Sequence, residues 1–162
     1  MRIHKPTVEE VRASAGKKIP DVIGPGLEVL FCGINPGLYS AAVGYHFARP
    51  GNRFWPALHV SGLTDRILKP HEQELLLEYG LGVTNLVARA TATAAEIADE
   101  ELRKGRSRLM RKIRRHRPGY VAILGIGAYR KAFRDSEAGP GHKEEGLSGA
   151  GLWVLPNPSG LN

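Results

Sequence analysis

The sequence predicts an α/β fold, a three-layer sandwich in which helices flank a mostly parallel sheet of about four strands. Two observations predict it. Short apolar runs, each as long as a strand buried on both faces, recur along the chain, and helical patterns separate them. Such alternation is typical of parallel sheets joined by right-handed crossovers. The predicted strands are residues 27–32, 81–87, 120–124 and 151–155.

The chain has 162 residues, 42% of them hydrophobic, which suits one domain and is too short for two. We expect residues 1–26 to form a partly flexible N-terminal lead-in and residues 27–162 to form the single domain. Thr7 and Glu10 have the spacing of a capping box before a short helix, whereas residues 16–26 are rich in glycine, proline and lysine. The core is therefore expected to begin after the lead-in.

Helical patterns fill the gaps between the predicted strands. Thr93 and Glu96 have capping-box spacing and open one helical stretch. Residues 135–149 contain five glycines or prolines and four acidic residues, so we expect a surface loop or a loose hairpin there. The other predicted helices are residues 52–60, 72–79, 106–116 and 128–134.

Basic residues are concentrated in one stretch. The net charge is +7, and residues 103–117 hold nine of the 23 lysines and arginines but none of the 16 acidic residues. Leu109, Met110 and Ile113 form an apolar stripe among these cations, which predicts an amphipathic helix with a basic polar face. This charge favours an anionic partner such as nucleic acid, although a solvated helix face explains it equally well.

Cysteine usage and hydropathy exclude several classes of function. Cys32 is the single cysteine, so the chain cannot form an internal disulfide or supply the thiolates of a structural zinc or iron–sulfur site. The six histidines show no metal-ligand spacing, and we expect no metal. No stretch approaches the roughly 20 apolar residues of a membrane-spanning helix, and the N-terminus carries no secretory signal. We therefore expect a cytoplasmic protein with no membrane partner.

Two similar loops follow the first and the last predicted strands. In an open parallel sheet, ligands bind beyond the carboxyl ends of the strands, so both loops lie where a site is expected. The first contains Asn35-Pro36 and the second Asn157-Pro158, each with a glycine close behind. Proline fixes φ and removes a backbone donor, while glycine permits a sharp turn or a close approach to a ligand. We expect both loops to hold a fixed shape.

Three motifs are present in and between these loops: FCGINPGL at 31–38, GNRFW at 51–55 and NPSGL at 157–161. In these motifs the chain resembles the mismatch-specific uracil-DNA glycosylases and the related thymine-DNA glycosylases of the uracil-DNA glycosylase superfamily. The resemblance extends in order and spacing from about Pro25 to the last residue. It implies hydrolysis of the N-glycosidic bond of uracil, or of a related damaged or mispaired pyrimidine, after the nucleotide is flipped out of duplex DNA. It also implies a monomer that acts on double-stranded DNA with a G·U or similar mismatch and needs no cofactor.

The resemblance implies roles for residues of the first loop and its neighbours. Asn35 would position the attacking water; a carboxamide can orient water but cannot take its proton as a carboxylate does, so slow turnover is expected. Phe47 would stack on the flipped base, and a core aromatic is the alternative. The backbone near Ile34 and Phe47 and the side chain of Asn85 are the expected polar contacts to the base. Ser40 begins a stretch of small residues that is expected to lie around the 5-position of the flipped base.

The second loop is expected to contact the DNA. Leu161 corresponds to the apolar wedge that fills the gap left by the flipped nucleotide, and the backbone around Ser159 and Gly160 would face the unpaired guanine. Asn157 begins this motif. A mispaired base costs less to unstack, so G·U and G·T sites are favoured over A·U. The alternative for Leu161 is an ordinary exposed leucine.

The chain departs from the family pattern at Ala88. Relatives usually have an aspartate or glutamate at this strand end, where a carboxylate can stabilise the developing cationic sugar or help activate water. Ala88 is thus the position of a missing catalytic acid, and it motivates an alternative function, a mismatch- or damage-binding module with weak or impaired turnover. Relatives also continue past the position of Asn162 with a further helix, and an end at this residue is expected to weaken DNA binding.

The topology of the fold separates the basic residues of this helix into two groups, one at its start and one at its end. A crossover helix runs antiparallel to its strands, so its start lies toward the ligand edge and its end points away. We therefore expect Arg103, Lys104 and Arg106 to contact DNA, and the later arginines to lie away from it. A generic nucleotide-binding domain that uses residues 33–37 as a phosphate loop ranks last, because the chain lacks the G-x-G-x-x-G and P-loop patterns.

Overall fold

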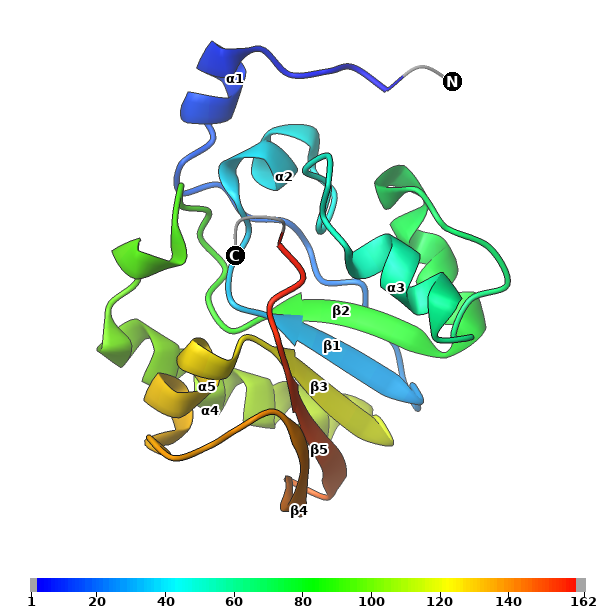
Figure 1. Cartoon of the computed structure of the whole chain (residues 1–162), viewed down its shortest axis with the longest axis vertical. Helices are drawn as coiled ribbons and strands as arrows, with labels where there is room; N and C mark the ends of the chain where they lie inside the picture. Colours follow the sequence, from blue (N-terminus) through cyan, green and yellow to red (C-terminus); the bar gives the residue numbers. More distant parts are fainter. Residues whose placement is uncertain (1–2, 160–162) are drawn as a thin grey trace.

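The computed structural model describes residues 3–159 and confirms the α/β fold. One five-stranded sheet has the order β2-β1-β3-β5-β4 (Figure 1). The strands are β1 (Val29–Gly33), β2 (Leu81–Asn85), β3 (Tyr120–Leu124), β4 (Gly141–Leu147) and β5 (Ala150–Leu155). β1 pairs in parallel with β2 and β3, and β3 pairs in parallel with β5, whereas β4 is antiparallel to β5. The sheet is therefore mostly parallel, as expected.

Helices lie on both faces of the sheet and make three layers (Figure 1). The helical segments are α1 (Val8–Arg12), α2 (Leu38–Val43), α3 (Phe54–Val60), the 3₁₀ helices η1 (Pro70–Tyr79) and η2 (Ala94–Glu96), α4 (Asp99–His116) and α5 (Ile126–Phe133). α4 and α5 pack on one face, and α3 and η1 pack on the other. Because side chains alternate along a strand, Leu30 and Cys32 of β1 join the core under α4, and Phe31 joins the core under α3.

β4 makes five strands where about four were predicted. Over residues 135–149 a loop or a loose hairpin was expected, and β4 indeed forms an antiparallel hairpin with β5 whose register is irregular. It lies at the edge of the sheet, and Leu147 is its one buried residue. Charged side chains such as Lys143 and Glu145 occupy much of the rest. Backbone pairing with β5, rather than an apolar run, holds this strand in place, and charge along an edge strand resists pairing with a second chain.

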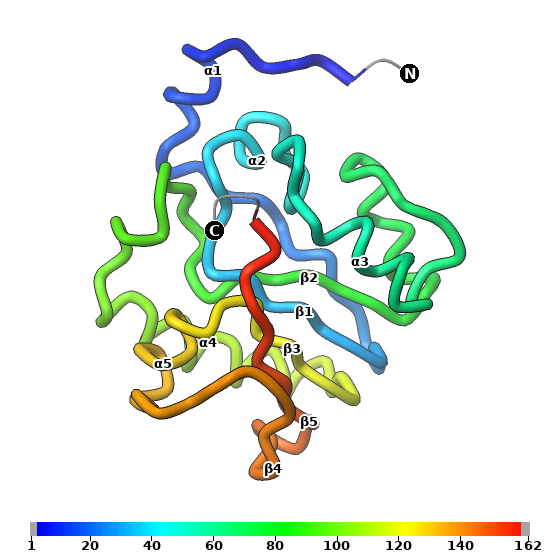
Figure 2. Tube along the Cα trace, in the orientation of Figure 1, coloured from blue at the N-terminus to red at the C-terminus, as the bar shows by residue number. Residues whose placement is uncertain are grey.

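Two segments outside the predicted elements contribute to the fold. Residues 38–43 form α2, which ends at the left-handed Gly44 and is too short for an apolar period to reveal it. In the lead-in, Val22 forms an antiparallel bridge with Val83 and is 1% exposed, so the core begins earlier than expected and the outer edge of β2 is covered. Helix α1 lies at one end of the molecule, beyond α2 (Figure 2).

The basic helix is longer than predicted. α4 begins at Asp99 rather than at residue 106, because Gly105 does not interrupt it. A Cβ atom at Gly105 would lie 2.2 Å from the backbone oxygen of Leu86, so glycine lets α4 approach the chain just after β2. Neither α4 nor any other helix within residues 3–159 has the length and apolarity needed to cross a membrane.

Gly105→Ala is expected to destabilise the fold. The added methyl group meets the Leu86 peptide, which cannot rotate away as the end of a flexible side chain can. Overpacking of this kind should lower the free energy of unfolding, measured by urea denaturation, by about 1–3 kcal/mol. Gly127→Ala in α5 is the matched control, because no atom lies within 4 Å of its added Cβ. Equal losses in the two variants would contradict a close approach at Gly105.

Candidate functional site

A pocket of about 840 Å³ opens at the carboxyl edge of the sheet. This edge is the expected position of a ligand in an open parallel sheet, and the volume lies in the range of small-molecule sites. Figure 1 shows the chain after β5 running past the carboxyl end of β1 toward α2. The pocket brings together seven of the predicted site residues: Ile34, Asn35, Ser40, Phe47, Asn85, Asn157 and Ser159.

Two hydrogen bonds fix the amide group of Asn35. Its nitrogen Nδ2 donates to the backbone oxygen of Arg89 at 3.0 Å and to Oγ1 of Thr91 at 2.8 Å. A carbonyl oxygen can only accept, so the amide nitrogen, and not the amide oxygen, lies on this side. Both N–H donors are thereby used, and the side chain has its oxygen Oδ1 left to accept a hydrogen bond from a water molecule in the pocket.

The segment after β2 holds the backbone of the first loop as well as the Asn35 side chain. The backbone N–H groups of Leu86, Val87 and Thr91 donate to the oxygens of Gly33, Ile34 and Pro36 at 2.9, 2.9 and 3.2 Å, respectively. These bonds continue the β1–β2 pairing beyond the ends of the two strands. The first loop therefore has one backbone shape, fixed along its length by its neighbour.

Thr91 and Arg89 are themselves held in place. The Thr91 hydroxyl donates to the backbone oxygen of Thr93 at 2.7 Å, so its single proton is used and its lone pairs remain to accept from Asn35. The Arg89 side chain forms a two-fold hydrogen-bonded ion pair with Glu101 of α4, with both N···O distances at 2.8 Å. The bonds from Arg89 lower the pKa of Glu101 to about 2. α4 thus anchors the segment that orients Asn35.

Phe47 and Asn85 meet across Gly33. A Cβ atom at Gly33 would lie 2.6 Å from Oδ1 of Asn85 and 3.3 Å from Cζ of Phe47, so glycine permits this close approach. The Phe47 ring rests on Phe54, with ring centres 4.2 Å apart and planes inclined by 30°. The Asn85 amide makes no hydrogen bond to the described part of the chain, so its donor and its acceptor are both free for a ligand. The pocket therefore offers an aromatic ring beside an amide.

The backbone of Phe47 is held in an unusual conformation. Its φ is +52°, in the left-handed region that is unfavourable for residues other than glycine. The N–H of His46 donates to Oε1 of Gln73 at 2.9 Å, and Nε1 of Trp55 donates to the His46 oxygen at 3.2 Å. On the other side of Phe47, the backbone N–H of Ala48 donates a hydrogen bond to Oγ of Ser40 at 3.0 Å. Ser40 lines the pocket, and its hydroxyl supports the turn that carries Phe47.

No carboxylate from residues 3–159 lines the pocket. His46 lines it but is 2% exposed, and burial lowers its pKa. Its Nε2 lies 2.8 Å from the backbone oxygen of Pro20, which can only accept, so Nε2 carries the proton of a neutral ring. The described residues contain no group of three or more histidine, cysteine, aspartate or glutamate side chains placed to hold a metal ion. Among the described residues, the polar groups beside Asn35 are therefore neutral dipoles, and no carboxylate base lies among them.

Arg53 connects the second loop to α3. Its backbone N–H donates to the oxygen of Pro158 at 2.9 Å, and its Nη2 donates to the oxygen of Ser159 at 3.2 Å. The N–H of Ser159 donates back to Oδ1 of Asn157 at 3.0 Å. The remaining predicted DNA contacts of this loop, Gly160 and Leu161, lie outside the described residues.

Four predicted site residues do not line the pocket. Ala88 is exposed, and Arg103, Lys104 and Arg106 of α4 are also absent from the pocket wall. The Arg106 guanidinium lies 5.1 Å from the centre of the Phe133 ring. These residues can therefore contact only those parts of a ligand that extend beyond the pocket.

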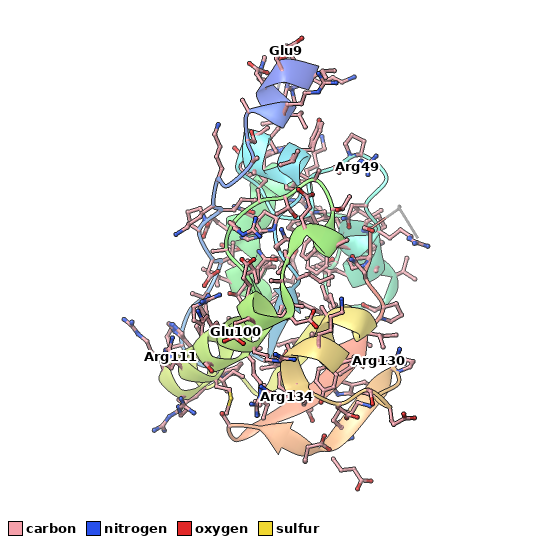
Figure 3. The ribbon with its side chains drawn as sticks, turned by 90° about the vertical axis from the view of Figure 1, so that its left-hand side faces the viewer. Glu9, Arg49, Glu100, Arg111, Arg130 and Arg134 are labelled. Atoms are coloured by element: carbon pink, nitrogen blue, oxygen red, sulfur yellow. The ribbon has the colours of Figure 1, made fainter. Side chains whose placement is uncertain are left out.

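Three residues at the site were missed by the sequence reasoning. Arg49 is an exposed cation on the pocket wall, and Figure 3 shows it beside α2, far from Arg111 on α4. Arg53 lies inside the GNRFW motif, but its hydrogen bonds to a loop more than 100 positions away leave no sequence signal. Thr91 could have been suspected from its position after a strand that neighbours β1, since that places it at the same edge.

A family model described as the uracil DNA glycosylase superfamily matches residues 20–162. The matched region contains all five strands, the pocket loops after β1 and β5, and Arg53. The fold, a mostly parallel five-stranded sheet flanked by helices, is consistent with this match. The chain therefore belongs to the uracil DNA glycosylase superfamily, and it is in that general sense a DNA glycosylase, a hydrolase of DNA repair.

Proposed function

We propose that this protein is a mismatch-directed, monofunctional member of the superfamily. It hydrolyses the N-glycosidic bond of uracil, and of related damaged or mispaired pyrimidines, opposite guanine in duplex DNA, and so initiates base excision repair. The observation that carries the proposal is the Asn35 amide, which Arg89 and Thr91 hold in one orientation in a pocket that also contains Phe47. The resemblance of the two Asn-Pro loops to the mismatch-specific branch supports the choice of opposing base.

The wall of the pocket suits a single flipped pyrimidine. The Phe47 ring offers a stacking surface that accepts any base face, and Phe54 behind it keeps the ring in place. The Asn85 amide carries a donor and an acceptor, which match the adjacent acceptor O4 and donor N3–H of uracil. Gly33 lets both groups lie close against the β1 backbone, because a Cβ atom there would meet them both.

The chemistry can proceed with an oriented water alone. The bond between C1′ and N1 breaks, and its electron pair leaves with the base as the uracil anion; the water oxygen adds to C1′, and its proton passes to solvent. Oδ1 of Asn35 accepts a hydrogen bond from this water, which directs a lone pair of the water oxygen at the sugar. Within residues 3–159 no carboxylate on the pocket wall takes the proton in advance, so departure of the base runs ahead of attack. Uracil should therefore leave faster than thymine, whose methyl group makes the anion less stable.

The rate of base release should vary little between about pH 7 and pH 8. The Asn35 amide does not titrate, and burial lowers the pKa of His46 from its ordinary value of 6.5, so the His46 ring does not gain a proton in this range. Single-turnover rates at constant ionic strength check this expectation. A bell-shaped profile centred in the range would instead reveal a general acid or base.

Release of free uracil tests the proposal directly. Single-turnover incubation with a G·U duplex should release uracil, faster than with an A·U duplex, and Asn35→Ala should slow the release strongly. A second candidate function is a mismatch- or damage-binding module with weak turnover, which the neutral Asn35 and the alanine at position 88 favour. Tight binding of the G·U duplex by wild-type protein, with no uracil released, would decide for this second candidate.

Charge reversal at the start of α4 should weaken DNA binding more than charge reversal at its end. The contact of Gly105 with the chain after β2 supports placing the start of α4 at the edge that carries the pocket. Lys104→Glu with Arg106→Glu should therefore lower affinity and flatten its salt dependence by about 0.9 in logarithmic slope for each lost phosphate contact. Arg114→Glu with Arg115→Glu is the matched control. Equal losses of affinity in the two double variants would refute this placement.

A further inference from the structure

Arg53 attaches the second loop to the wall of the pocket. It lies at the start of α3, between Asn52, which lines the pocket, and Phe54, on which the aromatic wall rests. It donates two hydrogen bonds to successive peptides of the loop, at the oxygens of Pro158 and Ser159. Arg53 therefore joins the second loop to the pocket wall, between two residues that belong to that wall.

The second loop depends on donors from outside itself. Pro156 and Pro158 have no N–H group, and the N–H of Ser159 is used within the loop, where it donates to Asn157. The oxygens of Pro158 and Ser159 are left for other partners, and Arg53 supplies both donors. One of these donors belongs to a charged, planar guanidinium, whose hydrogen bonds are stronger and more directional than those between neutral groups.

We infer that Arg53 is a positioning residue for duplex opening: it fixes the second loop, at Pro158 and Ser159, on the rim of the pocket, where the loop supports the opened base pair while the nucleotide is flipped. The inference rests on the proposed function. It assigns Arg53 no contact with the base or with the reacting atoms. Loss of Arg53 should therefore slow excision of a base that must first be unpaired, and it should spare excision of a base that has no partner.

Two duplexes separate these effects under single-turnover conditions. Uracil faces guanine in the first, and it faces an abasic-site analogue in the second, so that no base pair has to be opened. Arg53→Ala should release uracil about tenfold more slowly than wild type from the first duplex, as expected for the loss of one charge-assisted hydrogen bond, and nearly as fast from the second. Arg53→Lys keeps a charged donor on a long side chain and should recover most of the G·U rate.

Arg111→Ala is the matched control. It removes the same charge from an exposed arginine on α4, far from Arg49 at the pocket (Figure 3), and it should leave the ratio of the two rates unchanged. Each ratio is taken on one protein preparation, so an unfolded fraction cancels from it.

The outcomes distinguish this inference from the proposed function. Equal slowing of Arg53→Ala on both duplexes, with a flatter salt dependence of binding, would assign Arg53 to a DNA phosphate and overturn the inference. The inference would also be overturned if the ratio of the two release rates were the same in Arg53→Ala as in the active wild type. A wild-type protein that releases no uracil from either duplex would instead overturn the proposed function.

Discussion

Replacing Asn35 by alanine should slow single-turnover release of uracil from a G·U duplex by about 10²–10³-fold, the effect of removing one preorganised dipole from an active site. The Asn35 amide has both N–H groups committed to Arg89 and Thr91, so its oxygen is held ready for water before any substrate arrives. Affinity for the duplex should change little, because the stacking and phosphate contacts remain. Rapid-quench measurement of release and fluorescence anisotropy of binding check the two parts separately.

Asn35→Asp is the informative companion variant. It keeps the shape of the side chain but places a carboxylate oxygen opposite the Arg89 oxygen, where Nδ2 now donates at 3.0 Å. Two acceptors cannot share that position, so the carboxylate must turn or take up a proton, and Asn35→Asp should remain slower than wild type. A rate for Asn35→Ala within about threefold of wild type would show that the amide does not orient the water.

Thr91→Val should slow base release by up to about 10²-fold, although the two side chains have nearly the same shape. Valine cannot accept the hydrogen bond from Nδ2 of Asn35 or donate to the oxygen of Thr93, so the amide loses one of its two anchors. A small misorientation of a catalytic group is sufficient for a loss of this size. Thr91→Ser retains the hydroxyl and should restore most of the rate, with unfolding free energies measured in parallel.

A double-variant cycle shows whether Thr91 acts through Asn35. In an Asn35→Ala background there is no amide to orient, so adding Thr91→Val should change the rate no further. If the fold reductions in release rate caused by Asn35→Ala and Thr91→Val multiply in the double variant, Thr91 acts on the loop or on stability alone.

The sequence predicted those parts of the fold that apolar periodicity governs. The runs that became β1, β2 and β3 are buried on both faces along most of their length, whereas β5 is fully buried on one face only. The capping box at Thr7 and Glu10 forms with its two reciprocal bonds at 3.1 and 2.7 Å. β4 was missed because its hydrogen bonds to β5 require no apolar side chains. The start of α4 was missed because Gly105 has the appearance of a helix boundary, whereas its real role is to fit against Leu86.

The candidate site was predictable to the level of its loops. The rule for parallel sheets and the resemblance to known glycosylases both pointed to Asn35, and the structure places it on the wall of the pocket with Phe47 and Asn85. The anchors of these groups were not predictable, because Thr91 and Arg53 depend on how separate loops are aligned in space. The composition of the sequence and the spacing of its motifs do not predict that alignment.

β3 lies between β1 and β5, so the two pocket loops leave strands that are two places apart in the sheet. Neighbouring strands are about 4.8 Å apart, which separates the starting points of the two loops by about 9–10 Å. Interstrand hydrogen bonds, rather than either loop, set this width, and lengthening a loop cannot move its starting point. Engineering toward bulkier lesions should therefore change side chains around the mouth of the pocket, while the gap between the two starting points stays constant.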